Sequence, residues 1–170
     1  MAAGTGKSRS RLIVWIGAIL AAILALLVVI TEVSKSLERT QAEVWRLNWG
    51  FDTPEPEQLE RILAYPGRDH AQYSIARYSE EAVREMLAMP DWVSIESATG
   101  YVSALIDAFM TDLQQWYPED REKIAQLFVQ HPPVFDEQDY YLVKNESDGD
   151  RLIAVLNPDL RTLYVLESYQ

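Results

Sequence analysis

Side chains that could do chemistry are sparse in this chain of 170 residues. It contains two histidines, His70 and His131, and no cysteine, which excludes disulfides, thiolate metal sites and a cysteine nucleophile. His70 follows Asp69 and shortly precedes Tyr73, so this stretch could supply half of a catalytic or metal-binding pair. A single histidine in a turn is more often structural, and we expect that role here.

Carboxylates gather at three further places, where they could bind a cation or act as an acid–base pair. The three groups are Asp136-Glu137-Asp139, the pair Asp148 and Asp150, and the pair Asp107 and Asp112. The turn around Gly149 lacks the alternating ligands and closing glutamate of a calcium loop, and Asp-Gly is ordinary hairpin chemistry. The last pair lies on different parts of a helix face. With no Ser-His-Asp order, nucleophile elbow or glycine-rich dinucleotide loop, we expect no catalytic residue, no cofactor and no metal.

The longest apolar segment, residues 12–30 (LIVWIGAILAAILALLVVI), sets the position of everything that follows it. It has no charged residue, and as a helix it reaches about 28 Å, close to the roughly 30 Å of bilayer hydrocarbon. A cleaved signal peptide is the alternative, but its apolar core is usually about 7–15 residues long and ends at an A-x-A-like site. The sequence after Ile30 is TEVSK. We therefore predict an uncleaved transmembrane signal anchor.

The flanking charges predict the orientation of this span. Lys7, Arg9 and Arg11 precede it without any acidic residue, so residues 1–11 form a basic cytoplasmic tail and residues 31–170 are exported. The exported part holds all 26 acidic residues and 12 of the 15 basic ones, a net charge of −14. That charge opposes contact with nucleic acid. An exported domain without disulfides indicates the bacterial periplasm, with the anchor in the inner membrane.

Residues 31–49 contain no helix breaker and are predicted to continue the membrane helix outward as a stalk. Apolar residues recur on one face at alternating spacings of four and three, as in a short coiled-coil seam. This stripe packs either on the protein's own domain or on a partner's helix. Trp45 and Trp49 share a face and are expected to be buried against protein. The candidate partner-binding residues are Val33, Leu37, Val44, Leu47, Trp45 and Trp49.

Residues 50–170 read as one exported α+β domain of about four helices and a C-terminal three-stranded antiparallel meander. The predicted helices are 53–64, opened by Thr53-Pro54-Glu55, then 79–89, 99–116 and 118–131. Residues 70–78 fit a strand or a helical lead-in, and residues 92–95 fit a short strand. The meander is predicted from strands 140–144, 151–156 and 161–168, joined by turns at Asp148-Gly149 and Asn157-Pro158.

This layout leads to three functional hypotheses. The first is a non-catalytic accessory or assembly subunit of a multi-subunit inner-membrane complex, of respiratory, photosynthetic or secretion type. Its partners would be membrane subunits that contact the anchor and stalk, the lipid bilayer, and a basic exported protein. The second is a periplasmic sensing or solute-binding domain, which the 11-residue cytoplasmic tail disfavours because it has no room for an output domain. The third, an anchored hydrolase, lacks an identifiable nucleophile.

Overall fold

The computed structural model describes residues 39–66 and 70–170. The chain divides into two compact units, residues 1–40 and 41–170, and the second is the one described below. The predicted tail, the predicted span and residues 31–38 of the predicted stalk lie outside the described residues. Within the described ranges, no helix is both long and apolar enough to cross a membrane.

The second unit is an α+β domain, as the sequence predicts. Its α-helices are α2 (Gln41–Trp49), α3 (Glu80–Leu87), α4 (Thr99–Trp116) and α5 (Arg121–Gln130), with a 3-10 turn η1 (Pro118–Asp120) before α5. Its strands are β1 (Gln58–Tyr65), β2 (Ala71–Arg77), β3 (Val93–Ser94), β4 (Tyr140–Asn145), β5 (Arg151–Asn157) and β6 (Thr162–Ser168). The helix predicted over residues 99–116 is thus confirmed at both ends.

The six strands form one sheet in the order β1-β2-β6-β5-β4-β3, and every neighbouring pair is antiparallel. The predicted meander is confirmed as β4-β5-β6. It is only half of the sheet, because the last strand, β6, also pairs along its whole length with β2. The C-terminal strand of the domain is therefore hydrogen-bonded, in the middle of the sheet, to a strand from the N-terminal part of the domain.

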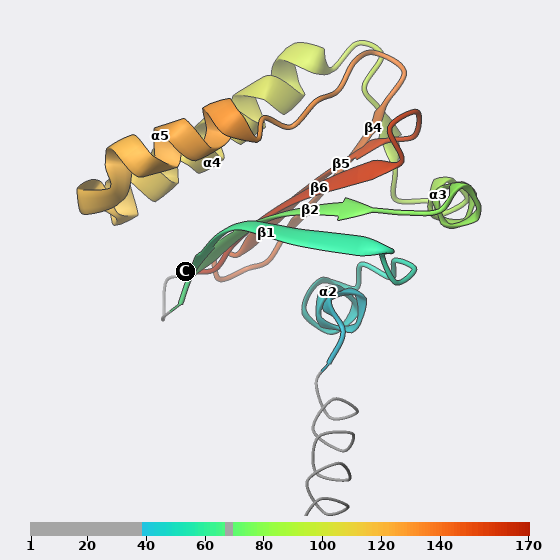
Figure 1. Cartoon of the computed structure of the whole chain (residues 1–170), viewed down its shortest axis with the longest axis horizontal. Coiled ribbons are helices and arrows are strands. Elements are labelled where there is room, and N and C mark those ends of the chain that lie inside the picture. The colour runs from blue at the N-terminus through green and yellow to red at the C-terminus, as the bar shows by residue number, and fades with distance from the viewer. Residues whose placement is uncertain (1–38, 67–69) are drawn as a thin grey trace, which may run out of the picture. The chain divides into compact units, whose positions relative to one another are not determined.

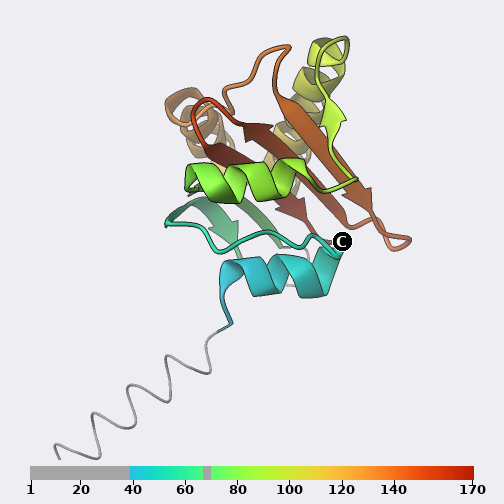
Figure 2. The ribbon, with the colours of Figure 1, turned by 90° about the vertical axis from the view of Figure 1, so that its right-hand side faces the viewer.

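Helices cover both faces of this sheet. α4 and α5 pack on one face, while α2 and α3 pack on the other (Figures 1 and 2). Alternate residues of β5 supply the two cores, with Ile153 and Val155 facing α4 and α5, and Leu152 and Ala154 facing α2 and α3. β5 and β6 are buried on both sides, which explains why they read as nearly continuous apolar runs.

The helix predicted over residues 53–64 is wrong, because this segment contains the edge strand β1. The strand has an irregularity between Arg61 and Leu63, and a bulge of this kind turns the following side chains to the other face. Leu59 accordingly packs with the α2–α3 core, whereas Ile62 and Leu63 pack with the α4–α5 core. The resulting spacing of apolar residues imitates a helix.

Two other stretches differ from or refine the sequence reading. Residues 71–77, left open between strand and helix, form β2. Arg39 and Thr40, expected within a continuous stalk helix, are not helical, and α2 begins at Gln41. α2 belongs to the compact domain, because the division of the chain falls before it.

Candidate functional site

The inner face of α2 is held to the sheet by its two tryptophans. Trp45 and Trp49 are one turn apart, so both side chains point the same way. Both are buried, in a cluster that includes Phe51, Leu152 and Leu163. The expectation that these indoles are buried against protein is confirmed, and the protein that buries them is this chain's own domain.

Both indoles donate hydrogen bonds to one buried carboxylate. Trp45 Nε1 lies 2.9 Å from Glu167 Oε2, and Trp49 Nε1 lies 2.9 Å from Glu167 Oε1. Tyr169 Oη donates to Oε1 at 3.0 Å, and Gln72 Nε2 approaches Oε2 at 3.4 Å. We call Trp45, Trp49, Glu167 and Tyr169 the tryptophan–glutamate clasp. Glu167 is only 2% exposed, so these donors replace the water that a carboxylate otherwise needs.

The clasp has no cationic member among the described residues: no Lys, Arg or His lies in an ion pair with Glu167. The pKa of the Tyr169 phenol is raised, first by burial and then by the negative charge of Glu167, so the phenol stays protonated and remains a donor. Its oxygen also accepts hydrogen bonds from Trp49 Nε1 at 3.0 Å and Asn48 Nδ2 at 3.2 Å. His70 stacks on the Tyr169 ring at a centroid distance of 3.8 Å.

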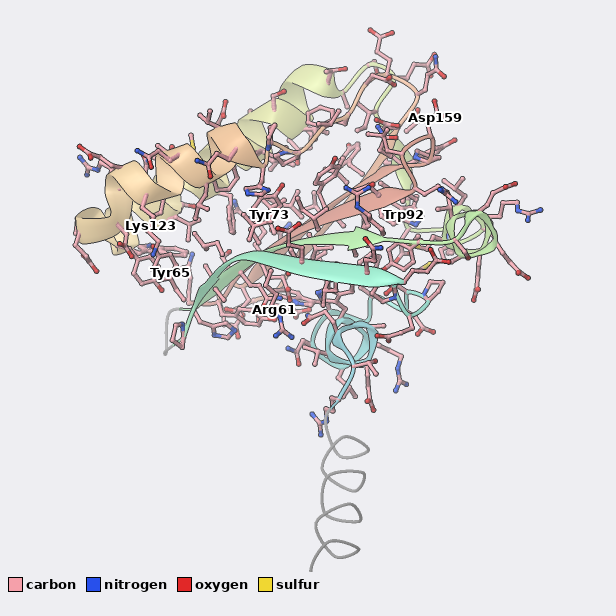
Figure 3. All side chains as sticks on the ribbon, viewed as in Figure 1. Arg61, Tyr65, Tyr73, Trp92, Lys123 and Asp159 are labelled. Atoms are coloured by element: carbon pink, nitrogen blue, oxygen red, sulfur yellow. The ribbon has the colours of Figure 1, made fainter. Side chains whose placement is uncertain are left out.

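This arrangement fixes the position of α2. Both carboxylate oxygens of Glu167 are occupied by donors of the same chain, so the clasp joins a helix to a sheet. A second polar contact from the same helix, Arg61 Nη2 to Gln41 Oε1 at 3.1 Å, ties β1 to α2, and Figure 3 shows Arg61 on the α2 side of the sheet. Since α2 is the first element of the domain, the clasp determines where the preceding chain enters it.

The predicted partner-binding residues are divided by this geometry. Trp45 and Trp49 point inward. Leu47 is 51% exposed, and Val44 is partly buried at the side of the helix. Val33 and Leu37 lie outside the described residues. The part of the predicted set that can meet another protein from α2 is therefore Leu47, with Val44 beside it.

The residues considered for a catalytic or metal pair are not brought together. His70 stacks on Tyr169 on the α2 side, while the Tyr73 ring stacks on Phe128 of α5, on the other side of the sheet (Figure 3). Tyr73 Oη donates to the carbonyl oxygen of His131 at 2.8 Å, which fixes the end of α5. Asp69 lies outside the described residues.

The acidic residues at 136–139 and 148–150 accept hydrogen bonds from backbone N–H groups of their own turns. Asp139 is buried, and its Oδ2 accepts from Asp136 N at 2.8 Å and Asn157 Nδ2 at 3.0 Å; burial raises the pKa of this carboxyl. Asp150 Oδ1 accepts from the backbone of Gln170 at 2.7 Å. Asp107 and Asp112 lie apart along α4, with no contact between them recorded. Over residues 39–66 and 70–170, no three potential ligands gather to hold a metal ion.

Sequence reasoning missed Glu167 as the centre of the clasp. The available signal is an acidic residue inside the apolar strand 161–168, at a position that alternation places on a buried face. A buried carboxylate requires hydrogen-bond donors. Two tryptophans one helical turn apart can supply two indole N–H donors from the same side of a helix. Comparison with known proteins adds nothing to this geometry, because no family model, curated protein or solved structure matches the chain.

Proposed function

We propose that this protein is a non-catalytic accessory or assembly subunit of a multi-subunit membrane complex in the bacterial inner membrane. In this proposal residues 12–30 form the single-pass anchor, the N-terminus is cytoplasmic, and the acidic domain contacts partner subunits in the periplasm. The observation that carries the proposal is the two-sided character of α2, a helix fixed on its inner side that leaves an apolar residue exposed on its outer side.

The outer side of α2 carries the last residues of the apolar stripe predicted from sequence, although the helix itself begins only at Gln41. Leu47 follows Val33, Leu37 and Val44 at the spacing of a coiled-coil seam. Burying one such leucine side chain against a partner stabilises the contact by about 1.5–3 kcal/mol. Because the clasp holds α2 in place, this side chain needs no further ordering of its helix before it binds, which lowers the entropic cost of association.

The surface charge supports a protein partner rather than nucleic acid. The exported residues carry 26 acidic side chains against 12 basic ones, a balance that repels phosphate backbones and attracts basic protein surfaces. A basic exported protein is therefore a second candidate partner in this proposal, alongside the membrane subunits that would contact the anchor.

The proposal is tested by isolating the full chain from membranes in mild detergent and identifying co-purifying proteins by mass spectrometry. We expect stoichiometric membrane partners with the wild type and their loss with Leu47→Asp. The matched control is Val129→Asp, which places the same charge at an apolar position that is 80% exposed on α5. Retention of every partner by Leu47→Asp, or equal loss with Val129→Asp, would refute the role of this helix face. A wild-type chain that purifies alone would refute the proposed function.

A further inference from the structure

A hollow of about 220 Å³ lies at one end of the sheet, where β1, β2 and β6 meet. It is lined by Glu57, Gln58, Arg77, Tyr78, Leu160 and Arg161. The end of β2 is joined to both neighbours here, since the backbone of Arg77 accepts from Glu57 N at 2.9 Å and Tyr78 N donates to Arg161 O at 3.0 Å. These contacts fix the backbones that carry the lining side chains.

This end of the sheet is separate from the clasp. In the pairing of β2 with β6, Arg77 lies opposite Thr162, whereas Gln72 lies opposite Glu167 at the far end of the same two strands. A ligand in the hollow therefore does not depend on α2, and a partner of α2 does not depend on the hollow.

Two arginines line this hollow, and the charge of one of them, Arg77, also acts on the buried Tyr164 phenol, where it opposes the rise in pKa that burial causes. Arg77 and Arg161 form no ion pair, and no side-chain hydrogen bond of theirs is present, within the described part of the chain. One carboxylate, Glu57, lines the hollow with them, so the lining side chains carry a net charge of +1. This is a positive site in a protein whose formal net charge is −11.

The backbone at Arg161 is also unusual. Its φ is +51°, and it is the one non-glycine residue with positive φ among those described. Such a conformation costs about 1–2 kcal/mol for a residue with a side chain, and glycine adopts it without that cost. The turn of residues 158–161 places its charged residues at two hollows, since Asp159 lines a second hollow and Arg161 lines this one.

One buried side chain belongs to the same wall. Tyr78 is 1% exposed and packs in the α2–α3 core, where its hydroxyl lies beside Thr53. The same residue lines the hollow. The wall therefore combines two guanidinium groups that form no ion pair with a tyrosine that the core holds in place.

We propose that this hollow binds a small anion through a carboxylate or phosphate group held by Arg77 and Arg161. A guanidinium offers parallel N–H donors that match either group. At about 220 Å³ the hollow is smaller than the pockets of roughly 300–1,000 Å³ that hold drug-sized ligands, so it suits a smaller molecule. Glu57 and Gln58 favour an anion that also carries a hydroxyl donor. The proposal goes beyond the membrane-subunit function and does not rest on it.

The test uses the full chain in mild detergent and a buffer free of phosphate and carboxylates. Inorganic phosphate and L-malate are titrated separately by isothermal calorimetry. We expect one-to-one saturable binding of at least one probe, and the probe that binds identifies the phosphate or the carboxylate as the recognised group. Arg77→Gln and Arg161→Gln should each weaken binding by about tenfold or more, the loss of one charge-assisted contact.

The controls separate local binding from general charge effects. Arg84→Gln removes an exposed arginine on α3 and should leave binding unchanged. Arg161→Gly removes the guanidinium but suits the backbone, so it should remain folded and still lose binding. Absence of saturable binding by both probes, an equal effect of Arg84→Gln, or undiminished binding by Arg161→Gly would each overturn the proposal.

Discussion

Trp45 Nε1 donates a hydrogen bond to Glu167 Oε2 at 2.9 Å although 122 residues separate the two in sequence. One lies on the first helix of the domain and the other on its last strand. The contact therefore joins that helix to the strand that lies between β2 and β5 in the sheet. It links the point where the chain enters the domain to the strand that completes the sheet.

Replacing Glu167 with glutamine should destabilise the domain by about 1–3 kcal/mol, because an amide can accept through one of its two positions only. The two indole donors lie on different carboxylate oxygens, so one of them would then face an NH₂ group. Urea unfolding followed by far-ultraviolet circular dichroism measures the change. Glu137→Gln, at an exposed turn position, is the matched control and should stay within about 0.5 kcal/mol of wild type. Equal stabilities of the two variants would show that the clasp contributes nothing.

Phe109→Ala should cost about 3–5 kcal/mol, the usual range for truncating a central aromatic side chain. Phe109 is buried on α4 and lies 6.3 Å from the Phe128 ring, which itself stacks on Tyr73. The comparison variant is Val129→Ala, an exposed position on α5 that should change the unfolding free energy by less than about 0.5 kcal/mol. A loss below about 1 kcal/mol for Phe109→Ala would mean that this core collapses around the gap.

The elements that sequence predicted well are those whose pattern is local. α4 combines a wide apolar face with a length of 18 residues, and its pattern is helical without ambiguity. The strands β4, β5 and β6 are bounded by Asp148-Gly149 and Asn157-Pro158, which are turn formers. In each case neighbouring residues alone carry the information.

What sequence could not supply depends on distant partners. β1 is a strand because β2 pairs with it, and its bulge hides the alternation that would otherwise identify it. The place of β6 beside β2 is equally non-local. Glu167 was missed for the same reason, since its donors Trp45 and Trp49 are more than 110 residues away. Arg77 and Arg161 are brought to one hollow by that same strand order.

The predicted orientation is testable with a reporter that is active only outside the cytoplasm. The reporter should work when fused after Gln170 and fail when fused before Leu12, because basic residues before a span, here Lys7, Arg9 and Arg11, favour a cytoplasmic N-terminus. N-terminal sequencing of the mature protein is the companion measurement. A mature chain that starts after Ile30 would contradict the anchor.

Removal of α2 should weaken the domain without preventing its folding. A fragment of residues 41–170 contains the whole compact unit and should melt cooperatively. A fragment of residues 50–170 retains the sheet but lacks both indole donors to Glu167, and the part of the core that α2 covers is exposed. This fragment should melt at a lower temperature. Calorimetry of both fragments decides the matter, and identical melting temperatures would show that α2 is only loosely attached.

The last prediction concerns two turns in which the backbone has positive φ. At Arg161 the φ of +51° is unfavourable for any residue with a Cβ, so Arg161→Gly should stabilise the protein by about 1 kcal/mol, less a small loss because glycine is freer in the unfolded chain. Gly149 is the opposite case, because its φ of +99° strains any residue that has a Cβ; the added Cβ would also displace the end of the Gln170 side chain, whose Oε1 lies 2.7 Å from it.

Gly149→Ala should therefore destabilise the domain by about 1–3 kcal/mol, the cost of holding a side chain in a sparsely populated backbone region. Urea unfolding of the two variants gives changes of opposite sign if the backbone alone decides stability at these turns. A loss of stability in Arg161→Gly would contradict this, since it would mean that the guanidinium makes a stabilising contact in the folded protein worth more than the strain. The same pair of variants then separates stability from binding, because only Arg161→Gly removes a side chain that lines the hollow.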